Sequence, residues 1–203
     1  MNQKAILHLN ADPVMSGLIA RVGHIPFRAR RHSLFQALTR AIVYQQLSGQ
    51  AAATILARFT ALFPDTDFPE PLHVAQTAID RMRGAGLSRP KARYIIDLAE
   101  RCHAGLLPSM EDCHRLTDEE IIARLTEVKG IGRWTAEMIL IFNLGRPDVL
   151  PVGDLGVRRG YQVAYRKRKL PEPEQLADFG SRWAPHRTTA ARYLWRAADG
   201  GAS

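Results

Sequence analysis

The amino-acid sequence predicts an all-α protein, and three observations support this fold class. Apolar residues recur at spacings of three and four, which is the pattern of a helix with one buried face. Several of these stretches begin after Ser, Thr or Asp, the residues that cap helix N-termini. Segments of alternating apolar and polar residues between turn residues, which are typical of strands, are nearly absent.

The expected helices of the first half begin at recognisable caps. Asp12 followed by Pro13 predicts a helix ending near Gly23, because aspartate caps the first turn and proline suits the first helical position. Ser33 and Gln36 form a Ser-x-x-Gln capping box before an apolar stripe. Further helices are expected over 48–63, 72–83 and from 88 to about 99.

The second half continues in the same way. Thr117 and Glu120 form a capping box for a helix that should end near Val128. The remaining expected helices cover 133–144, 155–165, 172–181 and 188–198.

Composition narrows the class of protein. The 203 residues carry 28 Lys and Arg against 20 Asp and Glu, a net charge of +8, with 46% hydrophobic residues. No apolar run approaches the roughly 18 residues of a membrane span, and the first residues lack the apolar region of a secretory signal. The positive charge fits either a polyanionic partner or simple solubility. Two cysteines, Cys102 and Cys113, exclude a four-cysteine metal or iron–sulfur site supplied by this chain alone.

The positive charge is concentrated toward the C-terminus. Residues 151–203 carry ten Lys and Arg against five Asp and Glu, and they include the run Arg166-Lys167-Arg168-Lys169. Such a run is usually a solvated face, although it also suits a polyanion.

A four-residue turn, Lys129-Gly130-Ile131-Gly132, separates two expected helices. Its glycines permit positive φ and close approach of the backbone, and Ile131 can fill the gap between the helices. The amides that open the second helix suit a phosphate oxygen. The alternative is an ordinary tight turn between antiparallel helices.

Residues 128–136, VKGIGRWTA, resemble the helix-hairpin-helix signature of the base-excision DNA glycosylase superfamily. The family's essential aspartate follows a Gly/Pro-rich loop, a position that Asp154 occupies here. Further similar blocks are 41–48, 86–99, 182–187 and 193–195. The tail resembles the alkylation-repair branch, typified by 3-methyladenine DNA glycosylase II. The resemblance implies two helical lobes with the active cleft between them: 32–145, with the hairpin near 129–132, and 1–31 plus 146–203.

Two departures from the wider family favour the alkylation-repair branch. Glycosylases that also cut the strand carry a lysine where this chain has Trp134, and an indole cannot form a Schiff base. The branches with a four-cysteine cluster carry it after the catalytic region, whereas no cysteine follows Cys113 here. The resemblance therefore implies a monofunctional enzyme without lyase activity.

The chemistry of base release explains how one carboxylate suffices. Breaking an N-glycosidic bond builds positive charge on the sugar, and a ring-alkylated purine leaves as a neutral base. An ionised Asp154 could stabilise that sugar and position water. A helix beginning at Leu155 would favour its anionic form. The alternative is that Asp154 only caps the helix.

The other candidate residues belong to base recognition and DNA binding. A flipped base needs a pocket, for which Trp134 and Trp195 are the main candidates and Tyr44 and Phe27 the weaker ones, with ordinary core packing as the alternative. Gln46 and Leu47 match the family segment that enters the gap left by the base, while Leu47 in the core is the alternative. The expected backbone contacts are Lys129, Gly130, Ile131, Gly132, Arg133, Thr135 and Arg158.

The sequence thus predicts a monofunctional DNA glycosylase acting on alkylated purines such as 3-methyladenine and 7-methylguanine in double-stranded DNA. No cofactor and no essential metal are expected, although family members hold a monovalent cation on the hairpin carbonyls. A monomer without membrane or obligate protein partner is expected, cytoplasmic in a bacterium or nuclear in a eukaryote and not secreted. Two alternatives remain: a non-catalytic module for distorted DNA, and a glycosylase for deaminated or oxidised bases.

Overall fold

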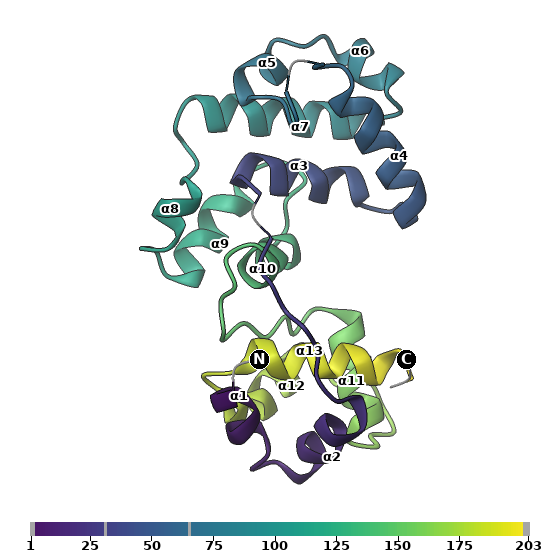
Figure 1. Ribbon diagram of the computed structural model, residues 1–203, viewed down its shortest axis with the longest axis vertical. Helices are drawn as coiled ribbons and strands as arrows, with labels where there is room; N and C mark the ends of the chain where they lie inside the picture. Colours follow the sequence, from purple (N-terminus) through teal and green to yellow (C-terminus); the bar gives the residue numbers. More distant parts are fainter. Residues whose placement is uncertain (1–2, 31, 65, 201–203) are drawn as a thin grey trace. The chain divides into compact units, whose positions relative to one another are not determined.

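The computed structural model of the protein describes residues 3–30, 32–64 and 66–200. Within these ranges the chain is helical and contains no strand, so the predicted all-α class is confirmed (Figure 1). The elements are α1 (Gln3–Leu9), α2 (Pro13–Val22), α3 (Leu34–Tyr44), α4 (Gly49–Thr60), α5 (Pro71–Ala75), α6 (Ile79–Gly84), α7 (Arg89–His103), α8 (Met110–Cys113), α9 (Asp118–Thr126), α10 (Arg133–Phe142), α11 (Leu155–Ala164), α12 (Pro173–Gly180), the 3-10 helix η1 (Ser181–Trp183) and α13 (Arg187–Ala198). No helix of the described ranges is both long and apolar enough to cross a membrane.

The chain divides into two compact units. The terminal unit consists of Met1–Ala29 and Leu140–Ser203, and the central unit consists of Arg30–Ile139. The expected boundaries were 32 and 145. In the structure the second boundary lies inside α10, so this one helix contributes residues to both units.

The terminal unit is built on the packing of α11 against α13. The two helices touch at Gly160, where an added Cβ would lie 1.9 Å from the carbonyl oxygen of Leu194. Helix α2 covers them, and its cap Asp12 accepts hydrogen bonds from the hydroxyl of Tyr165 and the indole of Trp183. The apolar core of this unit is therefore linked by hydrogen bonds to a half-buried carboxylate.

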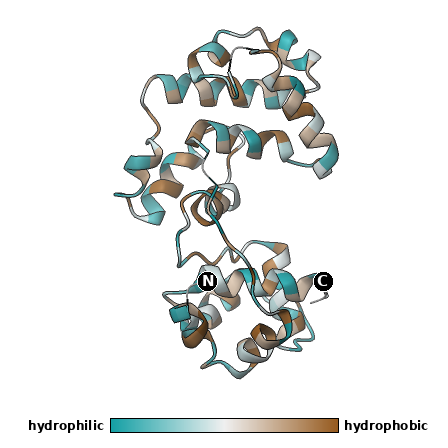
Figure 2. Cartoon of the chain, in the orientation of Figure 1, coloured by the Kyte–Doolittle hydropathy of each residue, from teal (hydrophilic) through white to brown (hydrophobic). Residues whose placement is uncertain are grey.

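The central unit is organised around α7, which packs against α3, α5 and α6. Its apolar face carries Ile95 and Leu98, both fully buried, while the opposite face is polar (Figure 2). The side chains of Ser33, Ser48 and Ser88 accept hydrogen bonds from the first turns of α3, α4 and α7. The predicted cap Ser33 is confirmed, and so is the predicted start of a helix at residue 88, where Ser88 is the N-cap.

Two short helices were not expected. Helix α1 buries Ala5 and Leu9 in the terminal unit, so packing within that unit supports it. Helix α8 is a single turn closed by a capping box between Ser109 and Asp112. The Ser-x-x-Asp spacing was a readable signal for this turn.

Candidate active site

Asp154 is the N-cap residue of α11. Its Oδ1 accepts a hydrogen bond of 2.8 Å from the amide of Val157, and its backbone is extended. The loop before it turns at Pro151, whose carbonyl accepts a hydrogen bond from the amide of Asp154 at 2.9 Å. The carboxylate is half-buried, so it is held by the helix end and still accessible. The predicted capping role is present, and it is compatible with chemistry at the same group.

Trp195 of α13 holds the same carboxylate. Its Nε1 donates a hydrogen bond of 2.8 Å to Oδ1 of Asp154, so both donors meet on one oxygen. Gly156 makes this approach possible, because a Cβ there would lie 2.8 Å from Cδ1 of Trp195 and 3.1 Å from Asp154 Oδ1. Sequence reasoning did not single out Gly156 as part of the site. The Gly-x-x-x-Gly spacing of Gly156 and Gly160, which lets two helices approach closely, was the available signal.

A row of aromatic rings continues from Trp195. Phe142 stacks on Trp195 with ring centroids 5.8 Å apart, and Phe27 contacts Phe142 at 6.4 Å. The guanidinium of Arg192 lies 4.5 Å from the centre of the Phe27 ring. The structure therefore brings two predicted pocket residues, Trp195 and Phe27, into one row that ends at Asp154. Phe142, which joins them, was missed because it reads as an ordinary apolar helix position.

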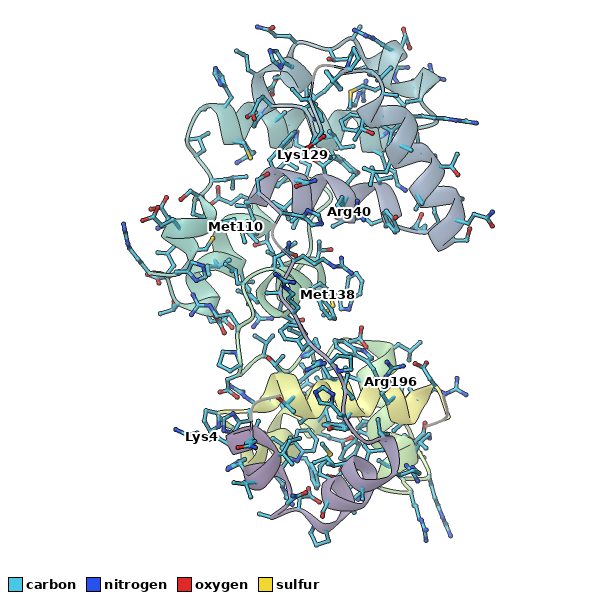
Figure 3. The ribbon with its side chains drawn as sticks, in the orientation of Figure 1. Lys4, Arg40, Met110, Lys129, Met138 and Arg196 are labelled. Atoms are coloured by element: carbon cyan, nitrogen blue, oxygen red, sulfur yellow. The ribbon has the colours of Figure 1, made fainter. Side chains whose placement is uncertain are left out.

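The predicted hairpin lies in the central unit between α9 and α10. Gly130 has φ +84°, and a Cβ at this position would lie 2.4 Å from the ring of Tyr94. Both the backbone conformation and the contact with Tyr94 therefore require glycine here. The Asp97 carboxylate accepts the amide of Lys129 at 3.4 Å, and both Tyr94 and Asp97 belong to α7. Figure 3 labels Lys129 at this turn, close to α7 and α3. Ile131 is buried and fills the gap between the helices, as expected.

The predicted wedge residues occupy the turn between α3 and α4. Gln46 has φ +57°, a region that glutamine rarely adopts, and Leu47 is 40% exposed although it is apolar. An exposed leucine on a strained turn is therefore not a core residue. The core alternative for Leu47 does not fit this placement.

Two side chains attach this turn to its surroundings. Gln45 donates its Nε2 to the carbonyl of Gly130 at 2.8 Å, and Lys91 donates its Nζ to the carbonyls of Val43 at 2.8 Å and Gln45 at 2.6 Å. Burial lowers the pKa of Lys91. Within the central unit, one direct hydrogen bond thus joins the wedge turn to the hairpin, and the two from Lys91 join the end of α3 and this turn to α7. Neither Gln45 nor Lys91 was singled out from the sequence.

Trp134 and Tyr44 belong to the central unit, whereas Asp154 belongs to the terminal unit. Trp134, in the first turn of α10, is 50% exposed, which is unusual for an indole. Tyr44 ends α3 and is half-buried, with the guanidinium of Arg40 lying 5.6 Å from the centre of its ring.

Several expected backbone contacts are engaged inside the protein. Arg133 forms ion pairs with Glu119 and Glu137, and hydrogen bonds from Arg133 lower the pKa of Glu119. Arg158 donates to the carbonyl of Pro171 at 2.8 Å and lies 3.7 Å from the carboxylate of Glu172. The side chain of Thr135 is buried. A phosphate would have to displace these contacts, so the exposed Lys129 and the main-chain amides of Gly130 and Gly132 fit the predicted role better.

The hairpin carbonyls offer only partial support for a cation. The Val128 carbonyl accepts the amide of Ile131 at 3.0 Å, and the Gly130 carbonyl accepts Gln45. Each oxygen keeps a second lone pair, so a monovalent cation stays a prediction. No group of three or more His, Cys, Asp or Glu in the described residues is arranged to hold a metal ion.

The fold and the site define an all-helical protein with a hairpin in one unit and a helix-capping carboxylate in the other. The model of the HhH-GPD superfamily of base excision DNA repair proteins matches residues 39–186, and the chain belongs to this superfamily. It is 39% identical to DNA-3-methyladenine glycosylase 1 of Schizosaccharomyces pombe over 95% of this chain and 86% of that protein.

Solved structures agree with this assignment. The Schizosaccharomyces pombe 3-methyladenine DNA glycosylase in complex with abasic DNA has a TM-score of 0.85 and 39% identity, covering 95% of each chain. A DNA-3-methyladenine glycosidase from Bacillus halodurans has a TM-score of 0.86 and 34% identity, covering 94% of this chain and 87% of that one.

Proposed function

We propose that the protein is a DNA glycosylase that releases alkylated purines from double-stranded DNA by hydrolysis, leaving an abasic site. The observation that carries this proposal is the half-buried Asp154 at the N-terminus of α11, held on Oδ1 by Val157 and Trp195. Its support is a relative named DNA-3-methyladenine glycosylase, 39% identical over nearly the whole chain.

Hydrolysis of the bond between an alkylated purine and its sugar needs little more than a well-placed carboxylate. A purine methylated at N3 or N7 carries a positive charge, so breaking its bond to the sugar yields a neutral base without prior protonation. The sugar becomes an oxocarbenium-like cation, which the negative charge of Asp154 stabilises. The same carboxylate can orient a water molecule and take its proton as the new C–O bond forms at the sugar. Trp195 and Val157 fix the direction of the carboxylate throughout.

The enzyme would select its base by the positive charge of the alkylated purine and by exposed side chains that can contact it. The exposed indole of Trp134 offers an electron-rich face, which attracts a cationic base more strongly than a neutral one. Leu47, exposed on its turn, would fill the gap in the stack once the base has rotated out. Gln46 beside it could bond the unpaired partner base. Lys129 and the hairpin amides would hold the phosphate backbone.

The proposed enzyme has no lyase activity. Strand cleavage by the lysine route needs an amine that attacks C1′ of the sugar, and the corresponding position carries Trp134. The enzyme should therefore stop at the abasic site. We further propose that it acts as a monomer without a cofactor, in the compartment that holds the cell's DNA.

The test is incubation of the protein with duplex DNA methylated at purines. Released 3-methyladenine and 7-methylguanine should be detected by chromatography, and the strand should break only after alkali. Binding without release would favour a non-catalytic module for distorted DNA. Release of deaminated or oxidised bases in place of methylated ones would favour a different glycosylase. Breakage without alkali would contradict the monofunctional mechanism.

A further inference from the structure

The basic run Arg166–Lys169 forms the loop that follows α11, and the candidate active site does not use it (Figure 1). All four side chains are exposed. None of them forms an ion pair within the described part of the chain, unlike Arg133 and Arg158. The loop is therefore a concentrated, unneutralised positive surface.

This surface lies away from Asp154. Asp154 caps the N-terminus of α11, and Arg166 follows its C-terminus, so the ten residues of the helix separate them by roughly 15 Å. Both ends belong to the terminal unit, in which their placement is defined. The loop cannot be part of the carboxylate's immediate surroundings.

Arg166 has a left-handed backbone conformation that glycine would adopt with less strain. Arg166 has φ +50°, and it stands at the position that ends a Schellman motif. Its amide bonds the carbonyl of Val163 at 3.2 Å, and the amide of Lys167 bonds the carbonyl of Gln162 at 2.8 Å. The last carbonyls of α11 are thus satisfied by the main chain, and the cationic side chains are not needed for that purpose. An arginine at a strained backbone position is a reason to ask what its side chain binds.

Two grooves flank the loop and extend the basic surface. Lys167, Arg168 and Lys169 line one groove together with residues of the following segment, including Glu172. The charge of Glu172 is matched by Arg158 at 3.7 Å. Arg166 lines the second groove together with Arg21 of α2. Five cationic side chains therefore face solvent around the C-terminal end of α11.

We propose that the loop Arg166–Lys169 is a second contact for the phosphate backbone of duplex DNA, separate from the hairpin and independent of sequence. Closely spaced cations match the phosphates of duplex DNA, which carry one negative charge per about 1.7 Å of axis. The contact would hold the protein on undamaged DNA between lesions. The proposal extends the proposed function, but it can be tested on undamaged DNA without any base release.

The test variant is Lys167→Gln/Arg168→Gln/Lys169→Gln, and its matched control is Arg58→Gln/Arg83→Gln/Arg124→Gln. The control removes the same charge from exposed positions of α4, α6 and α9. Binding to an undamaged duplex is measured by fluorescence anisotropy over a range of salt concentrations. We expect the loop variant to make the log–log salt slope less negative by about 2–3, because each phosphate contact contributes about 0.9. The control should change it by less than about 1.

An unchanged slope in the loop variant would overturn the proposal. An equal change of slope in both variants would also overturn it, because such a change would reflect net charge alone. Single-turnover excision at saturating enzyme is measured for the loop variant beside its binding to undamaged DNA. A loss of excision with unchanged binding to undamaged DNA would likewise contradict a separate DNA contact. Absence of excision by the wild type would reject the proposed function and leave the binding test intact.

A second variant separates charge from stability. Arg166→Gly relieves the positive φ, so Tm should rise by about 2–4 °C. The same variant should make the salt slope less negative by about 1, because it removes one phosphate contact. A rise in Tm with an unchanged slope would remove Arg166 from the proposed surface.

Discussion

Trp195 and Asp154, 41 residues apart, are joined by a hydrogen bond of 2.8 Å from the indole Nε1 to the carboxylate Oδ1. The same oxygen accepts the amide of Val157, so the carboxylate is fixed by α13 and by the first turn of its own helix. This arrangement limits the rotation of the Asp154 side chain. A carboxylate that must face a developing cation benefits from such prior orientation.

Asp154→Asn should separate catalysis from folding. Asparagine caps helices about as well as aspartate, and its carbonyl oxygen can accept both hydrogen bonds, so the free energy of unfolding should change little. The negative charge is lost, and we expect the rate of base release to fall by at least about 100-fold. Single-turnover release from methylated DNA measures the effect, and Asp199→Asn, at the exposed end of α13, is the control. Full activity in Asp154→Asn would remove Asp154 from the mechanism.

Gly156→Ala should act on the site through the indole. The added Cβ would stand 2.8 Å from Cδ1 of Trp195, which must move away from Asp154. The loss of a hydrogen bond to a charged group is worth about 1.5 kcal/mol, which corresponds to about a tenfold lower kcat. Trp195→Phe keeps an aromatic ring against Phe142 but lacks the donor, and it should show a similar decrease. If Trp195→Phe kept the wild-type kcat, the hydrogen bond would have no part in orienting the carboxylate.

Gly160→Ala should destabilise the terminal unit. A Cβ at this position would overlap the carbonyl of Leu194, so α11 and α13 would have to separate along their shared contact. Overpacking of this kind costs about 1–3 kcal/mol in the free energy of unfolding, which urea denaturation can measure. Gly17→Ala in α2 meets no atom within 4 Å and should instead stabilise the protein by about 0.5–1 kcal/mol. Equal stability of the two variants would contradict the close helix contact.

The sequence predicts the parts of this molecule that depend on local signals. Caps such as Ser33 and Thr117 act within one turn, and the hairpin turn needs glycine at Gly130 for its own backbone. The helices beginning at these residues could therefore be placed from spacing alone. Helix α1 was not placed in this way, because it is stabilised by the packing of Leu9 against segments far away in the chain.

The candidate site shows the same division. Asp154 could be placed at a helix N-terminus from its neighbours, but its bond to Trp195 depends on how α11 crosses α13. Arg158 was expected to face DNA, yet it turns to the carbonyl of Pro171, a contact that no local pattern encodes. The bond from Gln45 to Gly130 joins residues 85 positions apart, and nothing in the spacing predicts it.

The wedge turn offers a test of recognition without chemistry. Leu47→Ala should weaken the fluorescence increase of a 2-aminopurine base placed beside an alkylated or abasic site, because less apolar surface fills the emptied stack. Stability should change by less than about 0.5 kcal/mol, since the side chain is 40% exposed. Leu106→Ala, at 65% exposure in the same unit, is the matched control. A similar small effect from both variants would leave Leu47 without a role in base flipping.

The ion pair between Asp148 and Arg187 predicts a dependence of stability on pH. Arg187 donates to Oδ1 at 2.8 Å and to Oδ2 at 2.9 Å, tying the loop before α11 to the start of α13. Burial opposes the charge of Asp148, but the hydrogen bonds and the positive charge of Arg187 outweigh it and lower the pKa of the carboxyl group.

A lowered pKa in the folded state means that the pair stabilises the protein above the unfolded pKa of about 3.9. This stabilisation is lost as pH falls below that value and Asp148 becomes protonated. The difference in free energy of unfolding between wild type and Asp148→Asn should therefore be constant above about pH 5 and shrink between about pH 4 and pH 2. Urea denaturation of both proteins across this range measures it, and a difference that does not change with pH would show that the carboxylate charge contributes nothing.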